Sequence, residues 1–435
     1  MLYPSIRSVA ATLAAAGVAV IIQMAPAIAG DDDLNTEDYI EDVLKPSGRV
    51  LYTETNDISN AILAFRRDDQ GRLTPLPGSP FPAGGKGVID PSFKLGPPDA
   101  DQQVVVDRNR RLLFAVNSGS NTIAVFHIRS DGSLRPVPGS PFPSGGINPV
   151  SVGLRDNQIV IINKNEDPAQ TVPNSTPTIV TRHVTASGKI IQLPGDTTIN
   201  LVQGTSPSQA LAKNIRPFVF DALIFNPECN RVPPLSSPPC TPGSLASYKL
   251  FPSGQLVANP PQLLPASEAV NGIPPIPLGL WANPAARQLY VGFTSVEKLG
   301  VYTWDANGVP IFERTVPNSG LAICWLRTNS SETRLYTTNS GSGNISVYDT
   351  TDPSNPKEIQ VAPTSGAGGP YQLEVDPTDR FLYVVTERGQ HAAAGNAVHV
   401  FAINPKDGTL TEVPSSPVAV DLQSPDAFIQ GVALY

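Results

Sequence analysis

The chain has 435 residues, which suffices for two or three ordinary domains or for one large repeat fold. Its 46 Pro and 35 Gly would suit a disordered chain, but 40% hydrophobic residues, with 15 Phe and 11 Tyr, indicate a packed core. The formal net charge is −8 and no basic cluster occurs, which argues against nucleic acid as a partner.

Residues 1–29 have the pattern of a secretory signal peptide. Arg7 precedes an apolar stretch, and Ala-Ile-Ala at 27–29 matches the small-x-small cleavage pattern. An uncleaved membrane anchor is the alternative, although a Gln and a Pro interrupt the apolar run. We therefore expect a secreted or periplasmic protein with an acidic tail at 30–47, and no stable membrane span after the signal is removed.

Five segments of the chain repeat one pattern: an apolar run, a polar turn and a second run that alternates apolar and polar residues. They are RVLYTETNDISNAILAF from Arg49, RLLFAVNSGSNTIAVFHI from Arg111, RQLYVGFTSVEKLGVYTW from Arg287, RLYTTNSGSGNISVYDT from Arg334 and RFLYVVTERGQHAAAGNAVHVFAI from Arg380. Alternation of this kind predicts strands, and the polar turns predict hairpins. Two blurred copies, from about 148 and from about 206, raise the number of units to seven.

Each unit also has a short apolar run before the hairpin, and several have an Asp-Gly turn and a fourth run after it. The unit that starts at Arg287 is 47 residues long, and the next one is 46. Four strands in such a length predict a β-propeller blade. We expect an all-β, seven-bladed propeller over 48–435, in which the C-terminal strand DAFIQGVALY completes the first blade. Six or eight blades are the alternatives.

A proline-rich phrase marks the repeat. PLPGSPFPAGG ends at Gly85, PVPGSPFPSGG ends at Gly146, and a degenerate copy, EVPSSPVAV, occupies 412–420. Because proline is tolerated on edge strands, we expect the phrase at the outer edge of each blade, where the chain turns toward the next.

The repeated unit R-x-L-Y-x-x-N-x-G-x-N-x-I-x-V-F, followed by D-G-x-L, resembles the seven-bladed propeller lactonases, which include 6-phosphogluconolactonase and 3-carboxymuconate cyclase-like proteins. The family has HPHS-type and GPRH motifs at the third and fourth blades, and a Glu fifteen positions after the last His. Here those places read NPVS (148–151) and SPSQ (206–209), and the Glu position falls near Ala222, beside Asp221. The family's His, Arg and Glu are therefore replaced.

The last unit keeps part of this pattern. Gln372 is followed fifteen positions later by Glu387 and then by Arg388, and Gln209 occupies the register of Gln372. By the resemblance, Glu387 is the candidate base or water-positioning group, and Arg388 is the candidate that stabilises developing charge. The candidate ligand-binding residues are Gln372, Gln209, Asn148, Ser151 and His391. The alternative is that these side chains satisfy neighbouring backbone groups.

Cys229 and Cys240 lie eleven positions apart in a proline-rich loop, and we expect a disulfide between them. Cys324 is expected to be a small buried hydrophobic residue. We expect no cofactor and no metal centre, since no zinc or redox spacing occurs, although a calcium site of scattered acidic residues in the funnel stays open.

Two functions remain open. The first is a lactonase-like enzyme, a carboxylic ester hydrolase, that opens or isomerises a small lactone or cyclic acid in the central funnel. The second is a non-catalytic, secreted propeller that binds a ligand or a protein. In either case we expect a monomer whose partner is a polar or anionic small molecule.

Overall fold

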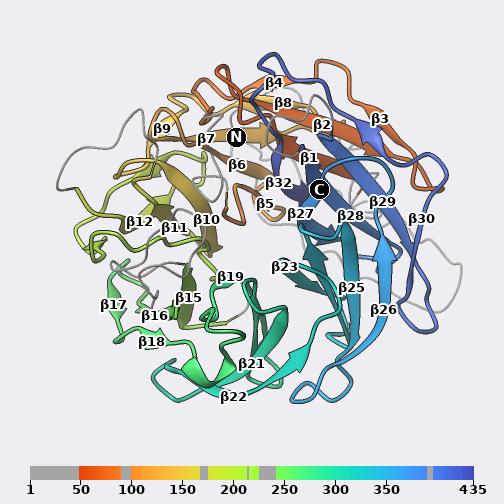
Figure 1. The fold of residues 1–435 in the computed structure, drawn as a ribbon. Coiled ribbons are helices and arrows are strands. Elements are labelled where there is room, and N and C mark those ends of the chain that lie inside the picture. The colour runs from red at the N-terminus through yellow and green to blue at the C-terminus, as the bar shows by residue number, and fades with distance from the viewer. Residues whose placement is uncertain (1–48, 90–98, 167–174, 213–214, 225–241, 389–394) are drawn as a thin grey trace, which may run out of the picture. The chain divides into compact units, whose positions relative to one another are not determined.

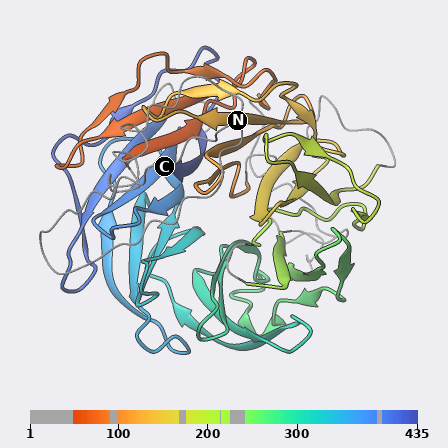
Figure 2. The same ribbon diagram turned by 180° about the vertical axis from the view of Figure 1, so that it is seen from behind.

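The computed structural model describes residues 49–435, except 90–98, 167–174, 213–214, 225–241 and 389–394. Within these residues, seven antiparallel sheets surround a central axis (Figure 1), and the view from behind shows the same ring (Figure 2). The predicted seven-bladed propeller is confirmed. The predicted signal peptide, Cys229, Cys240 and His391 lie outside the described residues, so the boundaries at 29 and 47 and the disulfide stay predictions.

The first two blades are built alike, with an outer strand split into two short pieces that both pair with the third strand. Blade 1 comprises β1 (Val50–Glu54), β2 (Ala61–Arg67), β3 (Leu73–Pro75), β4 (Phe81–Pro82) and the innermost strand β32 (Gln430–Leu434). Blade 2 comprises β5 (Val104–Asp107), β6 (Leu112–Asn117), β7 (Thr122–Ile128), β8 (Leu134–Pro136) and β9 (Phe142–Pro143).

The two units that are blurred in the sequence are also blades. Blade 3 comprises β10 (Pro149–Arg155), β11 (Gln158–Asn163), β12 (Thr178–Val184), β13 (Ile190–Ile191) and β14 (Thr198–Asn200). Blade 4 comprises β15 (Phe218–Leu223), β16 (Ser244–Leu250), β17 (Leu256–Ala258) and β18 (Gln262–Leu263). Its innermost segment is irregular and meets β15 through isolated bridges, Pro207 to Leu223 and Leu211 to Phe220.

The last three blades follow a short 3-10 helix, η1 (Ala266–Glu268). Blade 5 comprises β19 (Pro277–Asn283), β20 (Gln288–Phe293), β21 (Lys298–Trp304) and β22 (Pro310–Pro317). Blade 6 comprises β23 (Ile323–Thr328), β24 (Arg334–Asn339), β25 (Asn344–Asp349) and β26 (Lys357–Pro363). Blade 7 comprises β27 (Gly369–Val375), β28 (Phe381–Glu387), β29 (Ala397–Ile403), β30 (Leu410–Glu412) and β31 (Val418–Ala419).

Hydrophobic packing occurs between blades. The apolar side chains of the middle strands form clusters at the junctions of neighbouring blades, such as Tyr52 with Phe126 between blades 1 and 2, and Tyr290 with Tyr348 between blades 5 and 6. Near the axis the inner strands approach closely: a Cβ on Gly279 would lie 2.3 Å from the carbonyl oxygen of Cys324. Small residues on inner strands therefore permit the tight centre of the ring.

The repeated proline phrase has a structural reason. Its serine accepts a hydrogen bond from a backbone N–H in the middle of the third strand, where the outer strand is interrupted. The pairs are Ala64 N to Ser79 Oγ (2.9 Å), Val125 N to Ser140 Oγ (2.8 Å) and Val400 N to Ser416 Oγ (3.0 Å). The phrase lies at the outer edge, as predicted, but it also contributes the second outer piece, β4 in blade 1 and β9 in blade 2.

The ring closes through β32, as predicted. β32 pairs antiparallel with β1, and Val50 and Tyr435 exchange backbone hydrogen bonds of 3.0 and 2.9 Å. Glu54, fully buried at the end of β1, accepts hydrogen bonds from Gln430 Nε2 (2.6 Å) and Asn60 Nδ2 (3.3 Å). Burial outweighs these two bonds and raises the pKa of Glu54 to about 8. The closure therefore contains a carboxyl that is protonated at neutral pH.

The stability of the ring should depend on this proton. Because the pKa of Glu54 is higher in the folded chain than its ordinary value of 4.5, its contribution is fully present below about pH 4 and is lost as the pH rises through 8. We expect a loss on the order of 4 kcal/mol in the free energy of unfolding between pH 5 and pH 8.5, which Glu54→Gln removes. Urea unfolding at both pH values measures it. The exposed Asp421→Asn is the control, and an unchanged pH dependence in Glu54→Gln would contradict this assignment.

Candidate functional site

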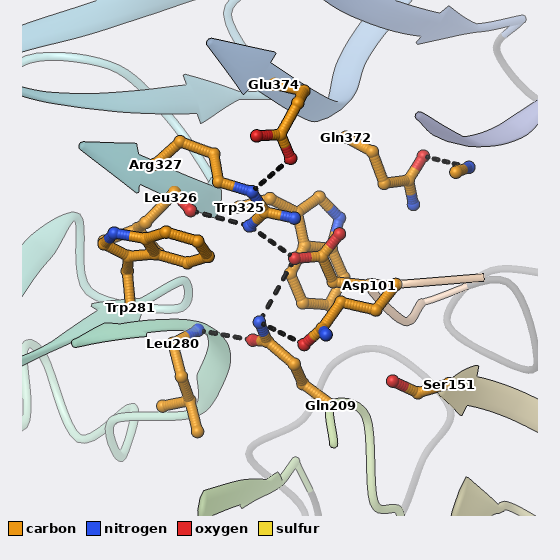
Figure 3. Close-up of polar contacts among 12 residues, drawn as sticks. Asp101, Ser151, Gln209, Leu280, Trp281, Trp325, Leu326, Arg327, Gln372 and Glu374 are labelled. Atoms are coloured by element: carbon orange, nitrogen blue, oxygen red, sulfur yellow. Dashed lines mark hydrogen bonds and ion pairs between the residues drawn. The ribbon is translucent and has the colours of Figure 1, made fainter. Parts of the chain in front are cut away.

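A short segment of blade 2 lies at the axis of the ring. Residues 99–103, directly before β5, are here called the axial segment; they contact side chains of four other blades (Figure 3 shows part of this network). Asp101 pairs with Arg327, and Asp99 O and Ala100 O accept hydrogen bonds from Lys164 Nζ (2.9 Å) and Gln372 Nε2 (2.8 Å). The centre of the propeller is therefore occupied by the chain's own polar groups.

Arg327 is the most highly connected charge at the axis. Its Nη1 lies 2.7 Å from Asp101 Oδ2, its Nε lies 3.1 Å from Glu374 Oε2, and its guanidinium stacks over the Trp281 ring at 4.5 Å (Figure 3). The side chain is only 4% exposed. Burial alone lowers the pKa of Arg327, but the charges of Asp101 and Glu374 outweigh it and raise the pKa above its ordinary value.

The register of the inner strands brings this group together. Leu280, Leu326 and Leu373 occupy matching positions opposite the second strands of blades 5, 6 and 7. The residue that follows each of them is Trp281, Arg327 and Glu374, respectively. Adjacent blades thus present an aromatic ring, a cation and an anion at one level of the axis.

The structure brings three of the predicted ligand-binding residues to the axis. Gln209 Nε2 donates to Asp101 Oδ2 (3.1 Å), and its Oε1 accepts the N–H of Leu280 (2.8 Å). The Oε1 of Gln372 accepts the N–H of Gly431 (3.2 Å), and Ser151 Oγ accepts that of Ala210 (2.9 Å). These side chains form hydrogen bonds with neighbouring groups of the chain, as the alternative to ligand binding predicted.

Asp221, next to the position expected for the family's Glu, holds the inner segment of blade 4. Its Oδ1 accepts the N–H groups of Ser208 (3.0 Å) and Gln209 (3.1 Å). Burial raises the pKa of Asp221 to about 7, against the lowering effect of those bonds. Asp221 therefore fixes the place of the Gln209 side chain.

Glu387 lies at the end of β28 and is 5% exposed. Burial, and then the charge of Asp99, raise the pKa of Glu387 well above its ordinary value. Among the described residues its Oε1 has no hydrogen-bond partner. Glu387 is thus a carboxyl near the axial segment with an oxygen that the described chain does not satisfy.

Lys164 holds the position of Glu387 in blade 3. Both residues directly follow the last pair between the second and third strands, which is Asn163 with Thr178 in blade 3 and Thr386 with Ala397 in blade 7. The ammonium group of Lys164 is buried and lies 3.8 Å from Glu166 Oε2. The same level of the ring therefore carries a cation and a carboxyl whose pKa is raised by burial.

Two further candidates from the sequence, Asn148 and Arg388, form hydrogen bonds with residues outside the axial segment. Asn148 borders Lys164: its Oδ1 accepts the N–H of Glu166 at 3.3 Å. Arg388 instead contacts the stretch before β32, through Ala427 O (3.0 Å) and Asp426 Oδ1 (3.5 Å). Cys324 is buried, as predicted, and burial raises the pKa of its thiol to about 12.

Four residues of the axis were not predicted from the sequence: Asp101, Arg327, Trp281 and Lys164. A signal existed for Lys164, because Asn117, Asn163 and Asn339 end the second strands of their blades in one register. No comparable signal existed for Asp101, which belongs to an insertion outside the repeat.

Removal of the buried cation should be costly. Arg327→Met leaves Asp101 and Glu374 without their counter-ion, and we expect about 3–5 kcal/mol of destabilisation. Chemical unfolding at pH 7 measures it, with Arg135→Met on the exposed side of β8 as the control. A loss below 1 kcal/mol would show that the ion pairs do not hold the axis together.

Three solved structures share this fold at low sequence identity. A candidate 6-phosphogluconolactonase from Bacteroides uniformis has a TM-score of 0.65 and 14% identity, covering 90% of this chain and 100% of that one. The periplasmic gluconolactonase of Pseudomonas aeruginosa has a TM-score of 0.62 and 14% identity, covering 88% and 98%. A hypothetical selenium-binding protein from Sulfolobus tokodaii has a TM-score of 0.61 and 11% identity, covering 90% and 94%.

No curated protein sequence matches this chain. Within the described residues, no helix is long and apolar enough to cross a membrane. The family model for the seven-bladed β-propeller lactonases matches residues 297–424, which cover the last two strands of blade 5 and all the strands of blades 6 and 7. The chain is a seven-bladed β-propeller that resembles the lactonase family, as its sequence repeat predicts.

Proposed function

We propose that this protein is an exported, lactonase-like hydrolase that opens a small, polar lactone at the axial end that carries Glu387. The observation that supports it is the buried carboxyl of Glu387, with its raised pKa and its unsatisfied oxygen. General bases work best when their pKa lies near the operating pH, and burial is the usual means to raise it. The resemblance to lactonases supports the reaction class.

The reaction needs one proton acceptor. In its ionised form, Glu387 takes a proton from water while the water oxygen bonds to the lactone carbonyl carbon. The ring C–O bond then breaks, the ring oxygen takes up the proton, and a hydroxy acid is released. Lys164, at the matching position in blade 3, supplies a positive charge at the same level of the axis.

A non-catalytic binding propeller is the second candidate. The observation that favours it is that Gln209, Gln372 and Arg327 are all bonded to the chain itself. The family's His, Arg and Glu positions are also replaced. The export signal at 1–29, the Cys229–Cys240 disulfide and a monomeric state belong to both proposals.

The test is hydrolysis of a panel of aldonolactones by the purified chain from Gly30 onward, with pH-stat titration of the acid released. We expect Glu387→Gln to lower kcat about 100-fold or more, which is the usual contribution of general-base catalysis. Glu313→Gln, an exposed carboxyl on the outer strand β22, is the matched control. Activity that survives Glu387→Gln would refute the assigned role, and no activity on any lactone would favour the binding propeller.

The pH profile gives an independent check. A base with a raised pKa is protonated, and inactive, below that pKa, so kcat/KM should rise with pH at values above the ordinary titration range of a carboxyl. Any residual activity of Glu387→Gln should lack this rise. A profile that is flat above pH 5 would contradict a raised pKa at the working base.

A further inference from the structure

We infer that Arg327 and Gln209 form a binding subsite for the carboxylate of a small polyhydroxy acid, and that Asp101 is its internal competitor. The subsite is seen with a carboxylate in it, because the Asp101 side chain occupies it (Figure 3). One oxygen of that carboxylate, Oδ2, receives both Arg327 Nη1 at 2.7 Å and Gln209 Nε2 at 3.1 Å. Arginine with an amide donor is a usual arrangement for carboxylate recognition.

The site is rigidly built. Arg327 is fixed by Glu374, by the Trp281 ring and by a bond of 2.8 Å from Nη1 to Leu326 O. Gln209 is fixed by the N–H of Leu280 and through Asp221. Donors that are held by other strands keep their positions when the carboxylate between them is exchanged.

Further donors contact carbonyl oxygens of the axial segment that carries Asp101. Lys164 Nζ and Gln372 Nε2 both donate to carbonyl oxygens of the axial segment. Trp325, on the same inner strand as Arg327, is fully buried, and its Nε1 has no partner among the described residues. A ligand that offers one carboxylate and several neutral oxygen acceptors would match these donors, and a polyhydroxy acid is such a ligand.

The charge balance favours exchange over addition. Arg327 already faces Asp101 and Glu374, so a second anion beside Asp101 would be repelled. If the ligand's carboxylate takes the place of Asp101, the charge around Arg327 stays the same. The axial segment must then move aside. Because Asp101 binds Arg327 in most molecules, the apparent affinity for the ligand is the intrinsic affinity multiplied by the fraction of molecules in which the site is open.

This inference extends the proposed function, because the opening of an aldonolactone yields such an acid. The product would compete with Asp101 for Arg327 and Gln209, and it would then be an inhibitor whose strength depends on Asp101. The subsite itself requires no catalysis, so its test can be separated from hydrolysis.

The test is the binding of sodium gluconate to the full mature chain by titration calorimetry at pH 7. We expect Asp101→Ala, which empties the subsite, to bind gluconate at least tenfold more tightly than the unaltered chain. Adding Arg327→Gln to Asp101→Ala should abolish this gain. Asp421→Ala, which removes an exposed carboxyl, is the control and should bind as the unaltered chain does.

Each outcome decides the proposal. Equal gluconate affinity in the unaltered chain and Asp101→Ala, or binding that survives Arg327→Gln, would overturn it. If Asp101→Ala does not fold, Asp101→Asn takes its place in the gluconate titration, and sodium formate should raise the thermal midpoint of Asp101→Asn while sodium chloride at equal ionic strength does not. Failure of both measurements would also overturn the proposal. Binding of gluconate should persist in the Glu387→Gln variant. If the unaltered chain shows this binding pattern but hydrolyses no lactone, the proposed function is refuted and the subsite stands.

Discussion

The ion pair between Asp101 and Arg327 is the interaction on which the centre of this molecule depends. It joins a segment at the entry to blade 2 with the inner strand of blade 6, and both side chains are almost fully buried. A buried ion pair adds little to stability when it replaces good apolar packing, but the loss of one partner is expensive. Its value here is positional, since it fixes the axial segment against side chains from blades 3, 4 and 7.

The periphery of the ring follows another rule. Each junction between blades is an apolar core, and in blades 1, 2 and 7 the outer strand is fastened by a repeated serine contact. These features recur because each blade meets the same packing problem. The axis has no such repetition, because the blades contribute different residues to a single shared space. Arg327, Trp281 and Glu374 occupy one register and yet differ in charge and size.

This contrast explains what could be predicted from the sequence. The strands, the seven blades and the closure by β32 follow from period-two alternation and from the recurrence of hairpins, and all were predicted. Gln209, Gln372 and Ser151 were also predicted for the site, from their register in the motifs by which the chain resembles the lactonases. Asp101 could not be, because it comes from an insertion and its partner lies 226 positions away in the chain. The position of Lys164 could have been predicted, because Asn163 before it recurs in the same register of other blades. It was not predicted, because the sequence of blade 3 is degenerate.

Asp101 and Arg327 act as a coupled pair that holds the axis closed. A double-mutant cycle with Asp101→Asn, Arg327→Gln and the combined variant measures this coupling from the free energies of unfolding at pH 7. The structure predicts a coupling of about 2 kcal/mol or more, since each single change leaves a buried charge without its partner. Additive effects of the two substitutions, to within about 0.5 kcal/mol, would contradict it.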